Sequence, residues 1–182
     1  KKQLTKALMK LKISKNRIPM LKRIIELNCI NPNILIDKYP LLGFAFLYDA
    51  IDIVKLLLKY DSIDVNACFP ENNESLLIKA IKTGKYETAQ LLIEHPKIDL
   101  SQKNSDGLSA LMIAVKINNK NICEMILNSK NFKIDEEEIN YAFFISESEI
   151  AKKLLSINSL NVNYVPFNCD TKNKRTPLIK SI

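Results

Sequence analysis

Ser75-Leu76-Leu77-Ile78-Lys79-Ala80-Ile81 is the stretch of sequence that decides the fold, because its pattern recurs along the chain. From residue 7 to residue 176, five steps of 33, 35, 34, 28 and 39 residues give a mean period close to 34. Self-similarity at such a period is typical of an array of stacked supersecondary units. Clear copies begin at Ser109 and Thr176, fainter ones at Pro40 and Glu137, and a weak first copy near Ala7.

Each copy carries a large apolar residue followed three positions later by a small one. This pairing on one helical face allows neighbouring helices to interlock closely. Farther along, a paired apolar column predicts the core stripe of a second helix. The first column contains Met9, Leu42, Leu77, Leu111, Ile139 and Leu178, the second contains Ala45, Ala80, Ala114 and Ala142, and the third contains Ile24-Ile25, Leu57-Leu58, Leu92-Ile93, Ile126-Leu127 and Leu154-Leu155.

Helix and turn signals agree with this pattern. Asp52, Glu87 and Glu149 stand at the start of the second helix, where a carboxylate can accept free backbone N–H groups and complement the helix dipole. Turn formers separate the copies, and in Asp106-Gly107 both residues are expected to adopt the positive φ of a tight hairpin. Each unit is therefore predicted to contain two antiparallel helices and a turn.

On these motifs the chain resembles the ankyrin-repeat family, whose pattern is roughly D-G-x-T-P-L-H-x-A, then G, E-I-V-K-L-L-L and D-V-N. Residues 106–114 match the first part, and Asp52-Ile53-Val54-Lys55-Leu56-Leu57-Leu58 with Ile63-Asp64-Val65-Asn66 matches the rest. The glycine after the first helix survives as Gly84, and the histidine after T-P-L is absent. Tetratricopeptide repeats share the period but lack the Asp-Val-Asn exit, so they are the rival fold.

The resemblance implies an all-α solenoid of helix-turn-helix units with short hairpin fingers, about five and a half repeats long. We expect repeats at 1–33, 34–68, 69–103, 104–134 and 135–168, with a partial copy at 169–182. The 28-residue step predicts a deleted finger before Glu137. Because the last copy stops halfway through a helix pair, we expect a fragment of a longer array; an open end packed on another copy is the alternative.

Composition restricts the function classes. The chain has 182 residues, three glycines, no tryptophan and a single histidine, His95. Phosphate-cradling loops, histidine-dependent catalysis and multi-histidine metal sites are therefore disfavoured. Four cysteines without a CxxC pair indicate free thiols in a reducing compartment, and no apolar run approaches the length of a membrane span. We expect a soluble, cytoplasmic or nuclear protein that is not an enzyme and has no cofactor, metal or small-molecule substrate.

Proteins that resemble this chain bind partners along a concave face made by turn tips and the exposed side of the first helices. Several of the first-helix positions are apolar here, and an exposed apolar patch is typical of a contact surface. An alternative is that Phe144 and Ile145 cover the deleted finger and that Leu47 packs within its own repeat. The predicted partner-binding residues are Leu47, Tyr48, Glu71, Asn72, Glu74, Lys82, Thr83, Lys103, Ser105, Asp106, Leu108, Lys116, Ile117, Phe144, Ile145, Lys172, Asn173, Lys174 and Arg175.

The leading hypothesis is a non-enzymatic scaffold that binds a protein or peptide. A second hypothesis follows from charge, because the net charge of +7 is concentrated at the N-terminus: residues 1–23 hold nine Lys or Arg and no acid. Such a cluster could tether nucleic acid or an anionic membrane, although a solvated lysine-rich cap on the first repeat is its ordinary explanation. A third hypothesis is that the array targets a larger enzyme or effector. The acidic run Asp135-Glu136-Glu137-Glu138 is interpreted as a helix cap and not as a metal site.

Overall fold

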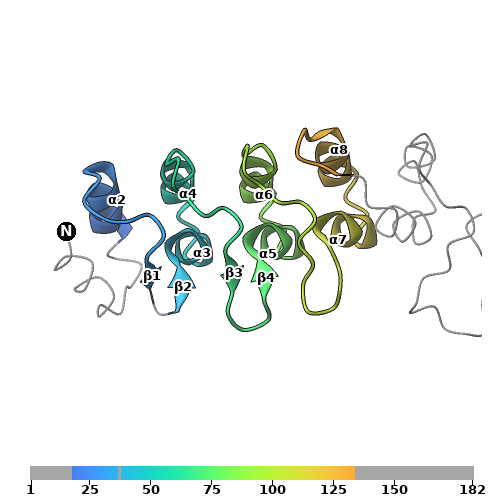
Figure 1. Cartoon of the computed structure of the whole chain (residues 1–182), viewed down its shortest axis with the longest axis horizontal. Coiled ribbons are helices and arrows are strands. Elements are labelled where there is room, and N and C mark those ends of the chain that lie inside the picture. Colours follow the sequence, from blue (N-terminus) through green and yellow to red (C-terminus); the bar gives the residue numbers. More distant parts are fainter. Residues whose placement is uncertain (1–17, 37, 134–182) are drawn as a thin grey trace, which may run out of the picture.

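The computed structural model describes residues 18–36 and 38–133, which form two rows of helices with hairpins on one side (Figure 1). The row beside the hairpins, here called the inner row, contains α3 (Leu41–Leu47), α5 (Leu76–Lys82) and α7 (Ala110–Lys116). The outer row contains α2 (Ile18–Glu26), α4 (Ile51–Leu57), α6 (Tyr86–Ile93) and α8 (Lys120–Asn128). The alternation of inner and outer helices confirms the predicted antiparallel pairs. Predictions for residues 1–17, 37 and 134–182, among them the helix start at Glu149 and the deleted finger before Glu137, lie outside the described residues.

Short antiparallel hairpins connect the repeats. Strand β1 (Leu35–Ile36) pairs with β2 (Tyr39–Pro40), and β3 (Cys68–Phe69) pairs with β4 (Glu74–Ser75). In the next repeat a single bridge joins Lys103 to Ser109. The hairpins point away from the outer row, so their tips and the inner helices share one side of the array (Figure 1).

The first two predicted core columns are confirmed for their described members. Leu42, Leu77 and Leu111 are buried in the inner row, and the alanines three residues later, at 45, 80 and 114, are completely buried. Since alanine has no side chain beyond Cβ, adjacent helices can approach until the leucines interlock, which gives the close packing of a protein interior.

Cys123 of α8 is also buried, and desolvation raises the pKa of its thiol to about 12.

Helix starts differ from one helix to another: Asn119 caps α8 of the outer row through its side chain, whereas α3 of the inner row follows Pro40 and has no side-chain cap. Ser75 and Ser109 cap α5 and α7, where each hydroxyl accepts the N–H of the residue three positions on, at 3.4 and 3.3 Å. Asp52 and Glu87 lie in the first turns of α4 and α6, where a carboxylate complements the helix dipole as predicted, but neither carboxylate accepts a backbone N–H group there. Their carboxylates instead pair with lysines of the preceding repeat, in Lys22–Asp52 at 3.2 Å and Lys55–Glu87 at 2.6 Å.

The column that contains Gly84 has a conformational explanation. Gly84 has φ of 72°, and Asp49 and Asn118, at the same position in the neighbouring repeats, have φ of 58° and 55°. Asp and Asn tolerate the left-handed region better than other residues with a side chain, so they replace glycine at small cost. At the Asp106-Gly107 turn, by contrast, Gly107 has positive φ and Asp106 does not, which corrects the expectation for Asp106.

Asparagine side chains connect successive repeats at the turn that follows each outer helix. Asn66 Nδ2 donates to the carbonyl of Lys97 at 2.9 Å, and the N–H of Asp99 donates to Asn66 Oδ1 at 2.8 Å. One repeat earlier, Asn33 makes the same two bonds with Ser62 and Asp64, at 2.6 and 2.8 Å. Asn33 and Asn66 therefore each fix one exit turn to the exit turn of the next repeat.

We predict that Asn66→Ala lowers the free energy of unfolding by about 1 to 2 kcal/mol, because two inter-repeat hydrogen bonds are lost. Chemical denaturation followed by circular dichroism measures this change. Asn121→Ala is the matched control, since Asn121 is exposed and makes no side-chain hydrogen bond to the rest of residues 18–36 and 38–133. Equal stability of the two variants would contradict a linking role for Asn66.

We predict that Ala80→Lys costs more than about 3 kcal/mol of folding free energy, because a buried lysine both overpacks the helix contact and loses its hydration. The same measurement applies. Gln90→Lys is the control, because it introduces the same side chain at an exposed position of α6 and is expected to change stability by less than about 0.5 kcal/mol. A folded and stable Ala80→Lys variant would refute the interlocking of leucine and alanine columns.

Candidate binding surface

The C-terminal ends of the inner helices bring six of the predicted partner-binding residues into one row. Leu47, Lys82 and Lys116 are the last residues of α3, α5 and α7, and each is followed by the residue that ends the helix. Lys82 Nζ donates to Glu74 of β4 at 2.7 Å, so this end of the inner row lies against the hairpin side. We call the row the inner strip; its members are Leu47, Tyr48, Lys82, Thr83, Lys116 and Ile117.

Two apolar members of the inner strip are open to solvent. Leu47 is 41% exposed and Ile117 is 42% exposed. The alternative that Leu47 packs fully within its own repeat is therefore wrong. Tyr48 differs, because its half-buried ring packs on Phe44 with the ring centroids 4.5 Å apart. Leu47 and Ile117 can accept a partner without rearrangement, whereas Tyr48 also stabilises its own repeat.

The polar members of the inner strip divide in the same way. Thr83 donates its hydroxyl to the carbonyl of Lys79 at 2.8 Å, so this group completes its own helix end. Lys82 is exposed but already paired with Glu74. Lys116 is exposed, and among residues 18–36 and 38–133 no carboxylate lies within 4.0 Å of its ammonium group.

The hairpin tips contain exposed and structural residues side by side. Glu71 is exposed and accepts a hydrogen bond from Tyr39 of the preceding hairpin, which is the main reason why the pKa of Glu71 is lowered and that of Tyr39 is raised. Asn72 holds the turn, since its Oδ1 accepts the N–H of Glu74 at 3.2 Å. In the next hairpin Ser105 and Asp106 are exposed, whereas Lys103 and Leu108 are half-buried.

Glu74 corrects the sequence-based expectation of a partner contact. It is 1% exposed, and its carboxylate lies 2.7 Å from Lys82 and 3.7 Å from Lys79. A buried carboxylate is tolerated when cations and hydrogen-bond donors surround it, and here the amide of Asn72 adds a bond at 3.2 Å. Glu74 therefore fixes the hairpin to α5 and has no free surface for a partner.

We predict that Glu74→Gln lowers the free energy of unfolding by about 1 to 2 kcal/mol, because the shape is retained while the charge facing two lysines is removed. The estimate is modest because both lysines are partly exposed and can be rehydrated. Asp106→Asn, at an exposed tip, is the control and should be nearly neutral. If Glu74→Gln were as stable as the parent, Glu74 would not be a structural residue.

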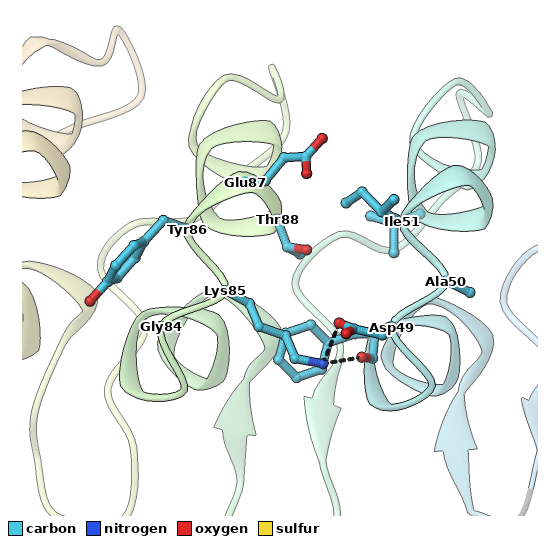
Figure 2. Close-up of a pocket in the computed structure, with 10 residues that line it drawn as sticks. Asp49, Ala50, Ile51, Gly84, Lys85, Tyr86, Glu87 and Thr88 are labelled. Carbon is cyan, nitrogen blue, oxygen red and sulfur yellow. Dashed lines mark hydrogen bonds and ion pairs between the residues drawn. The ribbon is translucent and has the colours of Figure 1, made fainter.

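A hollow of about 460 Å³ lies between the second and third described repeats, at the N-terminal turns of α4 and α6 (Figure 2). Lys85 reaches across it, donates to the carbonyl of Phe46 at 2.9 Å and pairs with Asp49 at 2.8 Å, as the dashed lines in Figure 2 show. Its ammonium also lies 4.5 Å from the Phe46 ring centroid. With Glu87 paired to Lys55, the lysine and the two carboxylates that line this hollow are engaged within the protein.

Lys85 and Asp49 were not singled out in the sequence. The available signal was weak: Asp49 replaces a glycine, and Lys85 directly follows one. Their contact joins residues 36 positions apart, so no local pattern connects them. They are inter-repeat contacts and not part of the inner strip.

Other chemistry-bearing groups have structural surroundings. The pKa of His95 is lowered, first by burial and then by the nearby charge of Lys97, and its Nδ1 accepts the N–H of Lys97 at 3.2 Å. In the described part of the chain, no three His, Cys, Asp or Glu side chains gather as metal ligands would. In the same part, no helix has both the length and the apolar character needed to cross a membrane.

Two groups of predicted contacts fall outside the described residues. The first comprises Phe144, Ile145, Lys172, Asn173, Lys174 and Arg175. The second is most of the basic segment, of which the structure describes Lys22 and Arg23. Lys22 pairs with Asp52 at 3.2 Å and Arg23 with Glu26 at 3.3 Å, so these two cations already have carboxylate partners.

Comparison with known proteins agrees with this geometry. The family described as ankyrin repeats, in three copies, matches residues 42–138. The match spans the three inner and outer helix pairs, from α3 and α4 to α7 and α8. No curated protein matches the chain significantly.

Proposed function

The chain belongs to the ankyrin-repeat family, and from that premise we propose that it is a non-enzymatic scaffold that binds a protein or peptide on the inner strip and the adjacent hairpin tips. Ankyrin repeats are generally protein–protein interaction modules. The exposed members of the proposed surface are Leu47, Lys82, Thr83, Lys116 and Ile117 of the inner strip, with Glu71, Ser105 and Asp106 at the tips.

The observation that carries this proposal is the exposure of Leu47 and Ile117 at equivalent helix ends. Moving an apolar side chain out of water is favourable, so a partner that covers Leu47 and Ile117 gains binding free energy from their burial. Both stand beside lysines and polar tip residues, and a mixture of apolar centre and polar rim is typical of protein interfaces. Neither side chain is part of the hydrophobic core, which is formed by the buried residues of the helices.

Binding at this surface requires little rearrangement of the array. The inner helices are held by interlocked side chains, and the hairpins by paired strands and the Glu74 ion pairs. A preformed surface loses less conformational entropy on association, so more of the contact energy appears as affinity. The mechanism is therefore surface complementarity on a rigid repeat stack.

We predict that Leu47→Lys combined with Ile117→Lys reduces partner retention by about tenfold or more, since two apolar contacts are replaced by charges. The measurement is affinity capture from a lysate of the source cells, followed by quantitative mass spectrometry. Leu27→Lys combined with Tyr86→Lys is the matched control, because it makes the same change at two exposed apolar residues outside the inner strip. Circular dichroism verifies that both variants are folded.

Equal retention by the two double variants would refute binding through the inner strip. A parallel capture after nuclease treatment tests the basic N-terminal segment. Material that is lost with nuclease, but retained by both variants, would assign the function to that segment. If the source cells contain this array fused to a catalytic polypeptide, that finding would support a targeting role.

A further inference from the structure

The two rows of helices differ in charge. In the inner row, α3 has no ionisable side chain, α5 has Lys79 and Lys82, and α7 has Lys116, so the row is basic and lacks carboxylates. The outer row contains both signs, and its charges pair along the array, as in Lys22–Asp52 and Lys55–Glu87. The outer row is thus neutralised internally, whereas the inner row is not.

The buried carboxylate of Glu74 does not cancel the positive charge of the inner row. Glu74 is buried and faces both Lys79 and Lys82, so one negative charge is shared by two positive ones. Glu71 and Asp106 keep their negative charges, and the pKa of Glu71 is lowered by the hydrogen bond from Tyr39, but both residues lie at the hairpin tips and outside the inner strip. The ionisable members of the inner strip itself are Lys82 and Lys116, and Lys116 is exposed with no ion pair inside the described part of the chain.

The lysines of the inner strip lie in the same row as its exposed apolar residues. Leu47 lies at the end of α3, Lys82 at the end of the next inner helix, and Lys116 with Ile117 at the end of the third. An occupant that spans the row meets an apolar contact, then positive charge, then positive charge beside a second apolar contact. Only a ligand with both acidic and apolar groups satisfies all of these positions.

Resting on the proposed function, we infer that the occupant of the inner strip is an acidic protein segment with apolar anchors. Its carboxylates face Lys82 and Lys116, and its apolar side chains cover Leu47 and Ile117. Nucleic acid fits this surface less well, because the inner helices contain no arginine for bidentate phosphate contacts and a phosphodiester backbone gains nothing from leucine and isoleucine.

The test is selection from a displayed library of random linear peptides against the full chain, with the Leu47→Lys and Ile117→Lys double variant used for counter-selection. We expect the recovered peptides to be enriched in Asp or Glu together with large apolar residues. Recovered peptides that are neutral or basic would overturn the acidic partner while leaving the proposed function intact. If every recovered peptide bound the parent and the double variant equally, both the acidic partner and the proposed function would be overturned.

A charge reversal then tests the contact itself. Lys116→Glu should weaken binding of a selected peptide by about tenfold, measured by fluorescence anisotropy. Lys120→Glu is the matched control, because it makes the same charge change at an exposed residue of the outer helix in the same repeat, and it should leave affinity within about twofold. Equal effects of the two reversals would overturn the inference, since they would indicate a general charge effect.

A labelled single-stranded DNA homopolymer serves as the second probe. We expect it to bind the parent and Lys116→Glu equally, and not to compete with the selected peptide. Competition that disappears at moderate salt, together with loss of DNA binding in Lys116→Glu, would overturn the inference in favour of a nucleic-acid surface.

Discussion

The close approach of neighbouring inner helices is the constraint on which the rest of the structure depends. It requires a side chain no larger than alanine at residues 45, 80 and 114, with a leucine three residues earlier to fill the space between helices. Because the three described inner helices satisfy this requirement in the same register, their ends and hairpins also repeat in register. The inner strip is a consequence of that regular stacking.

Polar contacts supplement the apolar core at its edges, and several of them cross from one repeat to the next. Asn33 and Asn66 connect successive turns, Lys22 and Lys55 reach carboxylates of the following outer helix, and Lys85 crosses back to Phe46 and Asp49. Individually these contacts contribute modestly because they are partly exposed. Together they neutralise the outer row and leave the inner row with unbalanced positive charge.

The candidate surface is consequently independent of the core. Leu47, Lys116 and Ile117 project from helix ends whose positions are fixed by buried residues elsewhere in the same helices. Substitution at these three positions changes what the surface can bind while leaving the interlocked columns intact. Tyr48, Lys82 and Thr83 combine the two roles, because each also makes an intramolecular contact.

The sequence by itself determined the repeat period, the helix pairs, the buried columns and the row of helix ends, because these follow from local spacing that recurs every repeat. Only the tertiary structure decided which polar residues remain available. Glu74 is buried and forms ion pairs with Lys79 and Lys82, and Asp52 is paired with Lys22 of the preceding repeat. Such pairings depend on side-chain directions and on partners in other parts of the fold, and residue spacing alone contains neither.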